Sequence, residues 1–227
     1  MTTFREDTAQ TSPPREITIL AGDVELDGLL TLPPDTLGMV AFAHGSGSSR
    51  FSSRNRQVAE ALNHAGLATL LFDLLTPLEH ERDAQTSEYR FDIALLTERL
   101  TGAVDWLSAN EDTAALPVGL FGASTGAAAA LMTAARRPHV VHAVVSRGGR
   151  PDLANDTLDQ VRAPTLLIVG GRDAEVITLN RKAASRLSCP HELIVIPGAG
   201  HLFEGPGQLE EVARTAAAWF RRHLPRT

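Results

Sequence analysis

Short, fully apolar runs alternate along the chain with longer stretches of helical periodicity, and this alternation limits the folds open to it. We expect strands at residues 39–43, 68–72, 116–121, 140–145, 165–169 and 193–196, and helices at 54–64, 89–108, 125–136, 176–187 and 209–224. Strands without a polar face are typical of a parallel sheet covered by helices on both faces. Residues 17–20 and 26–32, joined by a turn at 21–23, predict an antiparallel hairpin at one edge of this α/β sheet.

No linker, internal repeat or shift in composition divides the chain, so we expect a single domain over residues 15–227. Residues 1–14 are largely polar and predict a flexible N-terminal tail. Residues 75–88 are polar and irregular, and they predict a long loop that partly covers the site. The segment that follows strand 140–145 is too short for a full helical lid. The sequence therefore predicts an open site with no large cap domain.

Composition and charge narrow the classes of function. The 227 residues are 43% hydrophobic and 21% charged, which is ordinary for a soluble globular protein. A net charge of −6 disfavours nucleic acid and anionic membranes as partners, because both require a basic surface. The chain lacks a run of about 20 apolar residues and the apolar core of a signal peptide, and it has one cysteine, so we expect a cytoplasmic protein. Nothing in the pattern predicts its oligomeric state.

Ligands of such a sheet bind beyond the carboxyl ends of the strands, so residues just after strands are the functional candidates. Residues 122–126, Gly-Ala-Ser-Thr-Gly, lie between a predicted strand and a predicted helix and match the G-x-S-x-G pattern of a nucleophile elbow. Small neighbours permit the tight turn, and the helix N-terminus favours developing negative charge. The alternative is a turn that only connects strand to helix. The strand–turn–helix context favours Ser124 as a nucleophile.

A serine nucleophile needs a base, and the base needs an orienting carboxylate. Asp173 follows the predicted strand 165–169, and His201 lies on a glycine-rich turn after the last predicted strand. The order Ser, Asp, His along the chain is that of a large class of serine hydrolases. A surface-loop histidine is the alternative for His201. Asp152, which follows the preceding strand, is the alternative acid.

Acyl transfer also needs two N–H donors for the developing oxyanion. The residue after the nucleophile, Thr125, supplies one backbone N–H, and we assign the other to Ser46 in the loop at residues 44–50. The alternatives for this loop are a flexible turn or a phosphate-binding loop, but no G-x-x-x-x-G-K-[ST] or G-x-G-x-x-G pattern is present. No histidine or cysteine pair has metal-ligand spacing, so we expect no metal site.

Arg147 and Arg150 follow the predicted strand 140–145, at the edge of the sheet where ligands bind. Guanidinium groups bind carboxylates in a bidentate manner, so both are candidates for holding an anionic substrate. The alternative is that they pair with Asp152 or Glu175 at the surface.

These residues together resemble a known family. The matching segments are His44-Gly45, the pentapeptide at 122–126, Gly171-Arg172-Asp173 and Gly200-His201. They resemble the α/β-hydrolase superfamily, in particular its compact dienelactone-hydrolase-like members, and the resemblance spans residues 17–224. It implies the α/β-hydrolase fold, no cofactor, and hydrolysis of small esters or lactones, with Ser124 as nucleophile, Asp173 as acid and His201 as base. Dienelactone hydrolases themselves carry cysteine at the elbow, and the serine here indicates a general serine esterase.

Two other classes of function remain open at this point. An acyltransferase or perhydrolase would use the same three residues with a different acceptor. A non-catalytic binding module could keep the fold alone, although the complete set of Ser124, Asp173 and His201 argues against it. If the protein is a hydrolase, its expected partner is a small-molecule ester or lactone.

Overall fold

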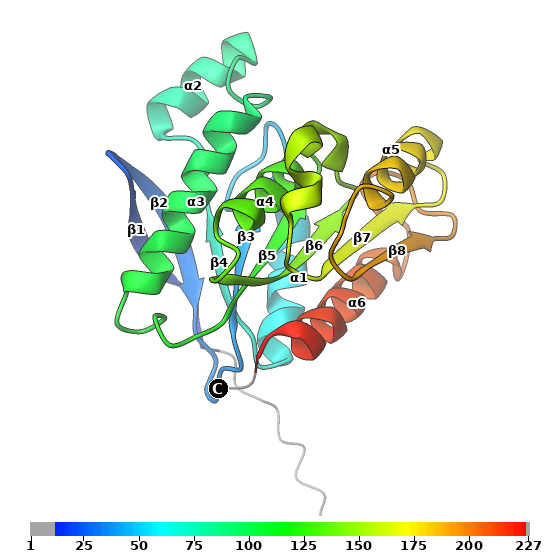
Figure 1. The fold of residues 1–227 in the computed structure, drawn as a ribbon. Helices are drawn as coiled ribbons and strands as arrows, with labels where there is room; N and C mark the ends of the chain where they lie inside the picture. The colour runs from blue at the N-terminus through cyan, green and yellow to red at the C-terminus, as the bar shows by residue number, and fades with distance from the viewer. Residues whose placement is uncertain (1–11, 226–227) are drawn as a thin grey trace, which may run out of the picture.

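The computed structural model describes residues 12–225, apart from the side chain of Asn155, and its centre is one twisted eight-stranded sheet (Figure 1). The strands are β1 (Arg15–Ala21), β2 (Val24–Thr31), β3 (Met39–Ala43), β4 (Ala68–Phe72), β5 (Val118–Ala123), β6 (Val141–Arg147), β7 (Thr165–Gly170) and β8 (His191–Ile196). Their order is β1-β2-β4-β3-β5-β6-β7-β8. Most of the predicted tail, residues 1–14, lies outside the described residues.

The sheet is mixed at one edge and parallel elsewhere, as predicted. The hairpin β1–β2 is antiparallel, and β2 also pairs antiparallel with β4. All pairs from β4 to β8 are parallel. Because parallel strands end at the same edge, the loops after β3, β5, β6, β7 and β8 meet there.

Helices cover both faces of the sheet, which confirms the predicted layers (Figure 1). They are α1 (Ser53–His64), α2 (Pro77–Thr86), α3 (Ile93–Ala109), α4 (Thr125–Arg136), the 3₁₀-helical segment η1 (Pro151–Gln160), α5 (Ala174–Ala184) and α6 (Gln208–His223). Helices α1 and α6 pack on one face, and α3, α4, α5 and η1 lie on the other. The apolar strands are therefore buried from both sides. Among residues 12–225 no helix has the length and apolar character needed to cross a membrane.

The prediction of a loop at residues 75–88 is wrong, because most of this segment is helix α2. Thr76 and Glu79 form a capping box at its start: the Thr76 side chain accepts from the Glu79 N–H, and the Glu79 side chain accepts from the Thr76 N–H. Pro77 occupies the first turn, where its missing N–H costs nothing. Asp83 is the buried residue of the helix. Since α2 has no apolar stripe, its polarity resembled that of a loop.

Of the other boundaries that differ from the sequence-based expectation, those of α3 and β6 bear on the site. The helix predicted from residue 89 begins at Ile93, after Asp92 caps it by accepting the Leu95 N–H at 3.0 Å. Strand β6 extends through Arg147, so this residue belongs to the sheet rather than to the loop after it. The side chain of Arg147 is therefore held in a strand register and not on a flexible turn.

Candidate active site

The turn between β5 and α4 has the geometry of a nucleophile elbow. Ser124 has a φ of 51°, a left-handed conformation that is unusual for a residue with a side chain. A Cβ on Gly122 would lie 2.4 Å from the Cα of Ala127, and a Cβ on Gly126 would lie 2.2 Å from the carbonyl oxygen of Ala43. Both neighbours must therefore be glycine for the chain to turn so tightly. Ser124 follows the strand at its carboxyl end, where we expected it.

His201 and Asp173 come together across the loops that follow β8 and β7. The Nδ1 atom of His201 lies 2.8 Å from Oδ2 of Asp173, and Asp173 is also the N-cap of α5. A carboxylate at this distance orients the imidazole with its proton on Nδ1, which leaves Nε2 free to accept another. The alternative acid, Asp152, is paired with Arg150 instead. The structure therefore brings His201 to Asp173.

Ser124 and His201 line one cavity of about 200 Å³, together with Ser46 and Arg147. Within the described part of the chain, the two side chains share this cavity without a direct hydrogen bond to each other. Catalytic hydrogen bonds in unliganded sites are often long and shorten when substrate binds. Thr125 is the first residue of α4, so its backbone N–H belongs to the helix N-terminus next to Ser124.

The loop after β3 lies against the elbow, as its assignment to the oxyanion site requires. A Cβ on Gly45 would lie 3.1 Å from the Cβ of Ser124. His44 is buried and holds this loop in place: its Nε2 accepts the N–H of Leu74 at 3.1 Å, and its Nδ1 lies 2.9 Å from the carbonyl oxygen of Gly45. Burial lowers the pKa of His44, which favours the neutral ring that this pair of contacts needs. Ser46 follows directly in the cavity wall.

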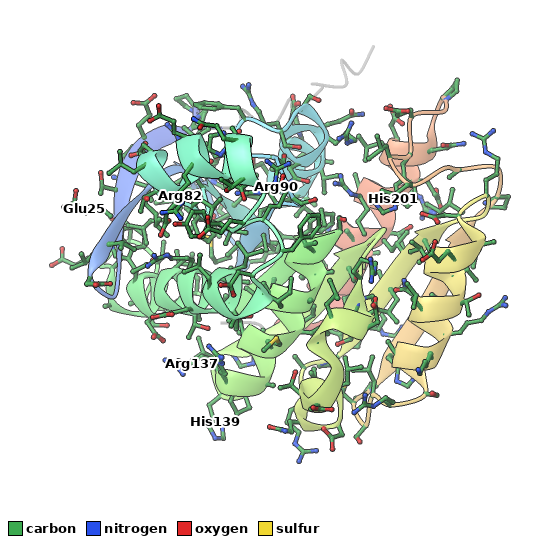
Figure 2. All side chains as sticks on the ribbon, turned by 90° about the horizontal axis from the view of Figure 1, so that it is seen from above. Glu25, Arg82, Arg90, Arg137, His139 and His201 are labelled. Atoms are coloured by element: carbon green, nitrogen blue, oxygen red, sulfur yellow. The ribbon has the colours of Figure 1, made fainter. Side chains whose placement is uncertain are left out.

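Arg90 supports the same loop from the side of α2, a contact that the sequence analysis did not find. A Cβ on Gly47 would lie 3.2 Å from Nη1 of Arg90. Asp83 holds Arg90 by accepting its Nε–H at 2.7 Å, and it accepts the N–H groups of Tyr89 and Arg90 at 2.8 and 2.9 Å. Burial acts to raise the pKa of Asp83, but these hydrogen bonds outweigh it, and the pKa is lowered. Figure 2 shows Arg90 beside α2 and His201 farther along the sheet.

The two arginines predicted to bind substrate have different surroundings. Arg147 lines the cavity at the end of β6 and is 8% exposed. Arg150 donates to both carboxylate oxygens of Asp152, at 2.9 and 2.8 Å, and is not part of the cavity wall. The surface-pairing alternative therefore holds for Arg150, because a neighbouring carboxylate two residues away already satisfies its guanidinium.

Two residues at the start of α1, Arg54 and Asn55, also line the cavity and were missed by the sequence analysis. They precede the first apolar residue of the helix, Val58, and no local motif marks them. Three buried polar atoms in this wall have no hydrogen-bond partner: Nε of Arg54, Oδ1 of Asn55 and Nη1 of Arg147. As for metal ions, no cluster of three or more His, Cys, Asp or Glu side chains with suitable geometry occurs among residues 12–225.

The sheet order, the strained serine after β5 and the histidine after β8 define an α/β hydrolase. A sequence model described as "Dienelactone hydrolase family" matches residues 26–224. The chain therefore belongs to the dienelactone hydrolase family, as its resemblance implied.

Similar proteins include a solved dienelactone hydrolase from Anabaena variabilis, with 56% identity and a TM-score of 0.92, covering 94% of this chain and all of that one. The esterase Est1E from Butyrivibrio proteoclasticus has 17% identity and a TM-score of 0.75, covering 93% of this chain and 98% of its own, which shows the shared fold. A Mycobacterium tuberculosis protein named putative phosphoribosyl transferase is 56% identical over 95% of this chain and 48% of its own length. The chain thus spans about half the length of this relative.

Proposed function

We propose that the protein is a serine hydrolase of small carboxylic esters or lactones that forms an acyl-enzyme on Ser124. One observation carries the proposal: the strained Ser124 shares a cavity with His201, whose Nδ1 lies 2.8 Å from the carboxylate of Asp173. Nucleophilic acyl transfer requires a serine, a base beside the serine, and an acid that orients the base.

In the proposed reaction, Nε2 of His201 takes the hydroxyl proton of Ser124 as the oxygen attacks the acyl carbonyl. Asp173 stabilises the resulting imidazolium, and the backbone N–H groups of Ser46 and Thr125 donate to the oxyanion. His201 then gives the proton to the leaving alcohol. A water molecule, deprotonated by the same base, attacks the acyl-enzyme. The bond from the acyl carbon to Oγ of Ser124 then breaks, His201 returns the proton to that oxygen, and the acid is released.

The comparisons support a hydrolase rather than a transferase. The Anabaena variabilis protein, which matches this chain over nearly its whole length, is named a dienelactone hydrolase. The transferase named for the Mycobacterium tuberculosis relative is not carried over, because the chain matches about half of that protein and the described site has the layout of a hydrolase.

The test replaces Ser124 by alanine in the full chain and measures hydrolysis of 4-nitrophenyl esters and simple lactones. We expect kcat to fall on the order of 10⁴-fold or more, as for triad members in other hydrolases. A fluorophosphonate probe should label the wild-type protein and a Ser185→Ala control, whose hydroxyl is exposed at the end of α5, but not the Ser124 variant. A folded Ser124→Ala protein with near-normal turnover would rule out the proposed nucleophile.

A further inference from the structure

Asn180 is a completely buried polar residue in the middle of α5, the helix that Asp173 caps and that packs beside β7 and β8 (Figure 1). Its Nδ2 donates two hydrogen bonds. One goes to the carbonyl oxygen of Val176 in the same helix at 2.8 Å, and the other to that of Gly149 at 3.0 Å. Gly149 belongs to the loop after β6, residues 148–150. The amide therefore joins α5 to this loop.

Stability alone does not account for an asparagine at this position. Asparagine is a weak helix former, and the Oδ1 of Asn180 is buried with no hydrogen-bond partner among residues 12–225, which lowers stability further. Residues that break such local rules are expected mainly where function requires them. The feature that this amide supplies, and that an apolar side chain would not, is its hydrogen bond to Gly149.

The loop after β6 is in turn fixed against the nucleophile elbow. Arg150 donates its backbone N–H to the carbonyl oxygen of Ser124 at 3.0 Å. A Cβ on Gly149 would overlap Oγ of Ser146, so the loop lies directly on the end of β6. A displacement of the loop would therefore be passed to the backbone of the serine through the Arg150 N–H.

The same loop also touches the turn that carries the candidate base. A Cβ on Gly148 would lie 3.0 Å from the carbonyl oxygen of His201 and 3.6 Å from its Cε1. Gly148 itself is held to β7, because its N–H bonds to the carbonyl oxygen of Ile168 at 2.8 Å. The loop after β6 thus lies between the elbow, the turn of His201 and the helix that Asp173 caps.

We propose that Asn180 is a positioning residue, which holds Gly149 and thereby sets the position of Ser124 relative to the base and its acid. The proposal rests on the proposed function, since it concerns the alignment of the same three side chains. Asn180 acts through the loop and does not line the cavity. A small displacement is sufficient, because a misplacement of about 1 Å can slow a reaction about 100-fold.

The test variant is Asn180→Leu, which keeps the approximate volume of the side chain and removes its hydrogen bonds. We expect kcat for 4-nitrophenyl acetate to fall about 10- to 100-fold with KM little changed, because the bound ester meets a misaligned serine. The pH at which kcat/KM is half-maximal should be that of the wild-type protein, because the contact between His201 and Asp173 is kept.

Counting reactive sites separates positioning from loss of the fold. A fluorophosphonate probe reacts once with each competent Ser124, so the final extent of labelling measures the folded fraction and the rate measures the alignment. We expect complete labelling of Asn180→Leu at a reduced rate. Hydrogen–deuterium exchange reads the backbone without chemistry at the serine, and peptides covering residues 147–153 and 122–128 should exchange faster in the variant.

Asn63→Leu is the matched control. Asn63 is a buried asparagine of α1 whose Nδ2 also donates twice, to the carbonyl oxygen of Leu67 at 2.9 Å and to Oγ1 of Thr69 at 3.1 Å, and it does not line the cavity of Ser124. Its variant should lose stability but keep the wild-type rate per labelled site. Asn180→Ala is the second test variant, and it replaces the leucine if that protein does not fold.

Slower labelling per site in the Asn180 variants, with faster exchange in the loop and the elbow and neither change in Asn63→Leu, supports the positioning role. A wild-type rate per labelled site in either folded Asn180 variant overturns it, and so does unchanged exchange, while hydrolysis by the wild-type protein keeps the proposed function. If the wild-type protein neither hydrolyses esters nor reacts with the probe, the proposed function fails, and the exchange decides whether Asn180 holds the loop against the elbow.

Discussion

Replacing Asp83 by asparagine should weaken the support of the loop after β3, residues 44–50, which lies beside Arg90 at Gly47. The amide oxygen of asparagine can still accept the N–H groups of Tyr89 and Arg90, but its NH₂ group would face the Nε–H of Arg90, which now bonds to Oδ2 at 2.7 Å. The loss is one hydrogen bond between charged groups, at a carboxylate that is 3% exposed. We expect a cost of about 2–3 kcal/mol, which lowers Tm by roughly 5–10 °C in a chain of this size.

The effect should depend on pH in a definite direction. Because the pKa of Asp83 is lower in the folded protein than in the unfolded chain, its contribution is complete above the unfolded value, near 4, and is lost as the pH falls through the lower folded value. Thermal or urea unfolding of the wild-type and Asp83→Asn proteins should therefore differ most at pH 7 and converge below about pH 4. Ester hydrolysis at pH 7 should also slow in the variant, since Arg90 packs against Gly47.

The matched control is Glu81→Gln, which removes the same charge from an exposed position of α2. It should shift Tm by no more than about 2 °C at any pH. If Asp83→Asn behaves like this control, or if its deficit grows as the pH falls, the reasoning about the buried carboxylate is wrong.

Two further predictions concern the loops of the candidate active site. Asp173→Asn should lower kcat by about 10⁴-fold, because His201 loses the partner that sets its tautomer, whereas Asp152→Asn should have little effect. Steady-state hydrolysis of a neutral ester measures both variants, and the reverse order of their kcat values would refute the assignment of Asp173 as the acid. Gly126→Ala should destabilise the protein by about 1–3 kcal/mol or more, because the new Cβ would lie 2.2 Å from a backbone oxygen at the end of β3. The control is Gly200→Ala, whose Cβ meets no atom within 4 Å and which should leave Tm nearly unchanged. Equal melting temperatures of the two variants would contradict the steric argument.

Local patterns were sufficient to predict the sheet, its hairpin edge and the elbow. The elbow motif depends on glycines two positions on either side of Ser124, and the structure shows the backbone approaches that require them. Local patterns were not sufficient to choose the acid, because Asp173 and Asp152 each follow a strand and each lie at the same edge of the sheet. Only the distance from Asp173 to His201 and the pairing of Asp152 with Arg150 separate them.

The missed features depend on contacts that hydrophobic periodicity does not report. Helix α2 has no apolar stripe and is held by its caps and by Asp83, although the sequence Thr76-Pro77-Leu78-Glu79 contains the capping-box signal that could have revealed it. The place of Arg54 in the cavity arises from the way α1 returns after β3, which is tertiary structure. No spacing along the chain encodes it.

The last residue of β6 has a main chain and a side chain with separate tasks. The carbonyl oxygen of Arg147 accepts the N–H of Ser124 at 3.2 Å, and the residue is paired with β5 on one side and β7 on the other. Any amino acid except proline that suits a strand can preserve this backbone. A substitution of this side chain can therefore change the charge of the cavity wall while the backbone that holds Ser124 stays where it is.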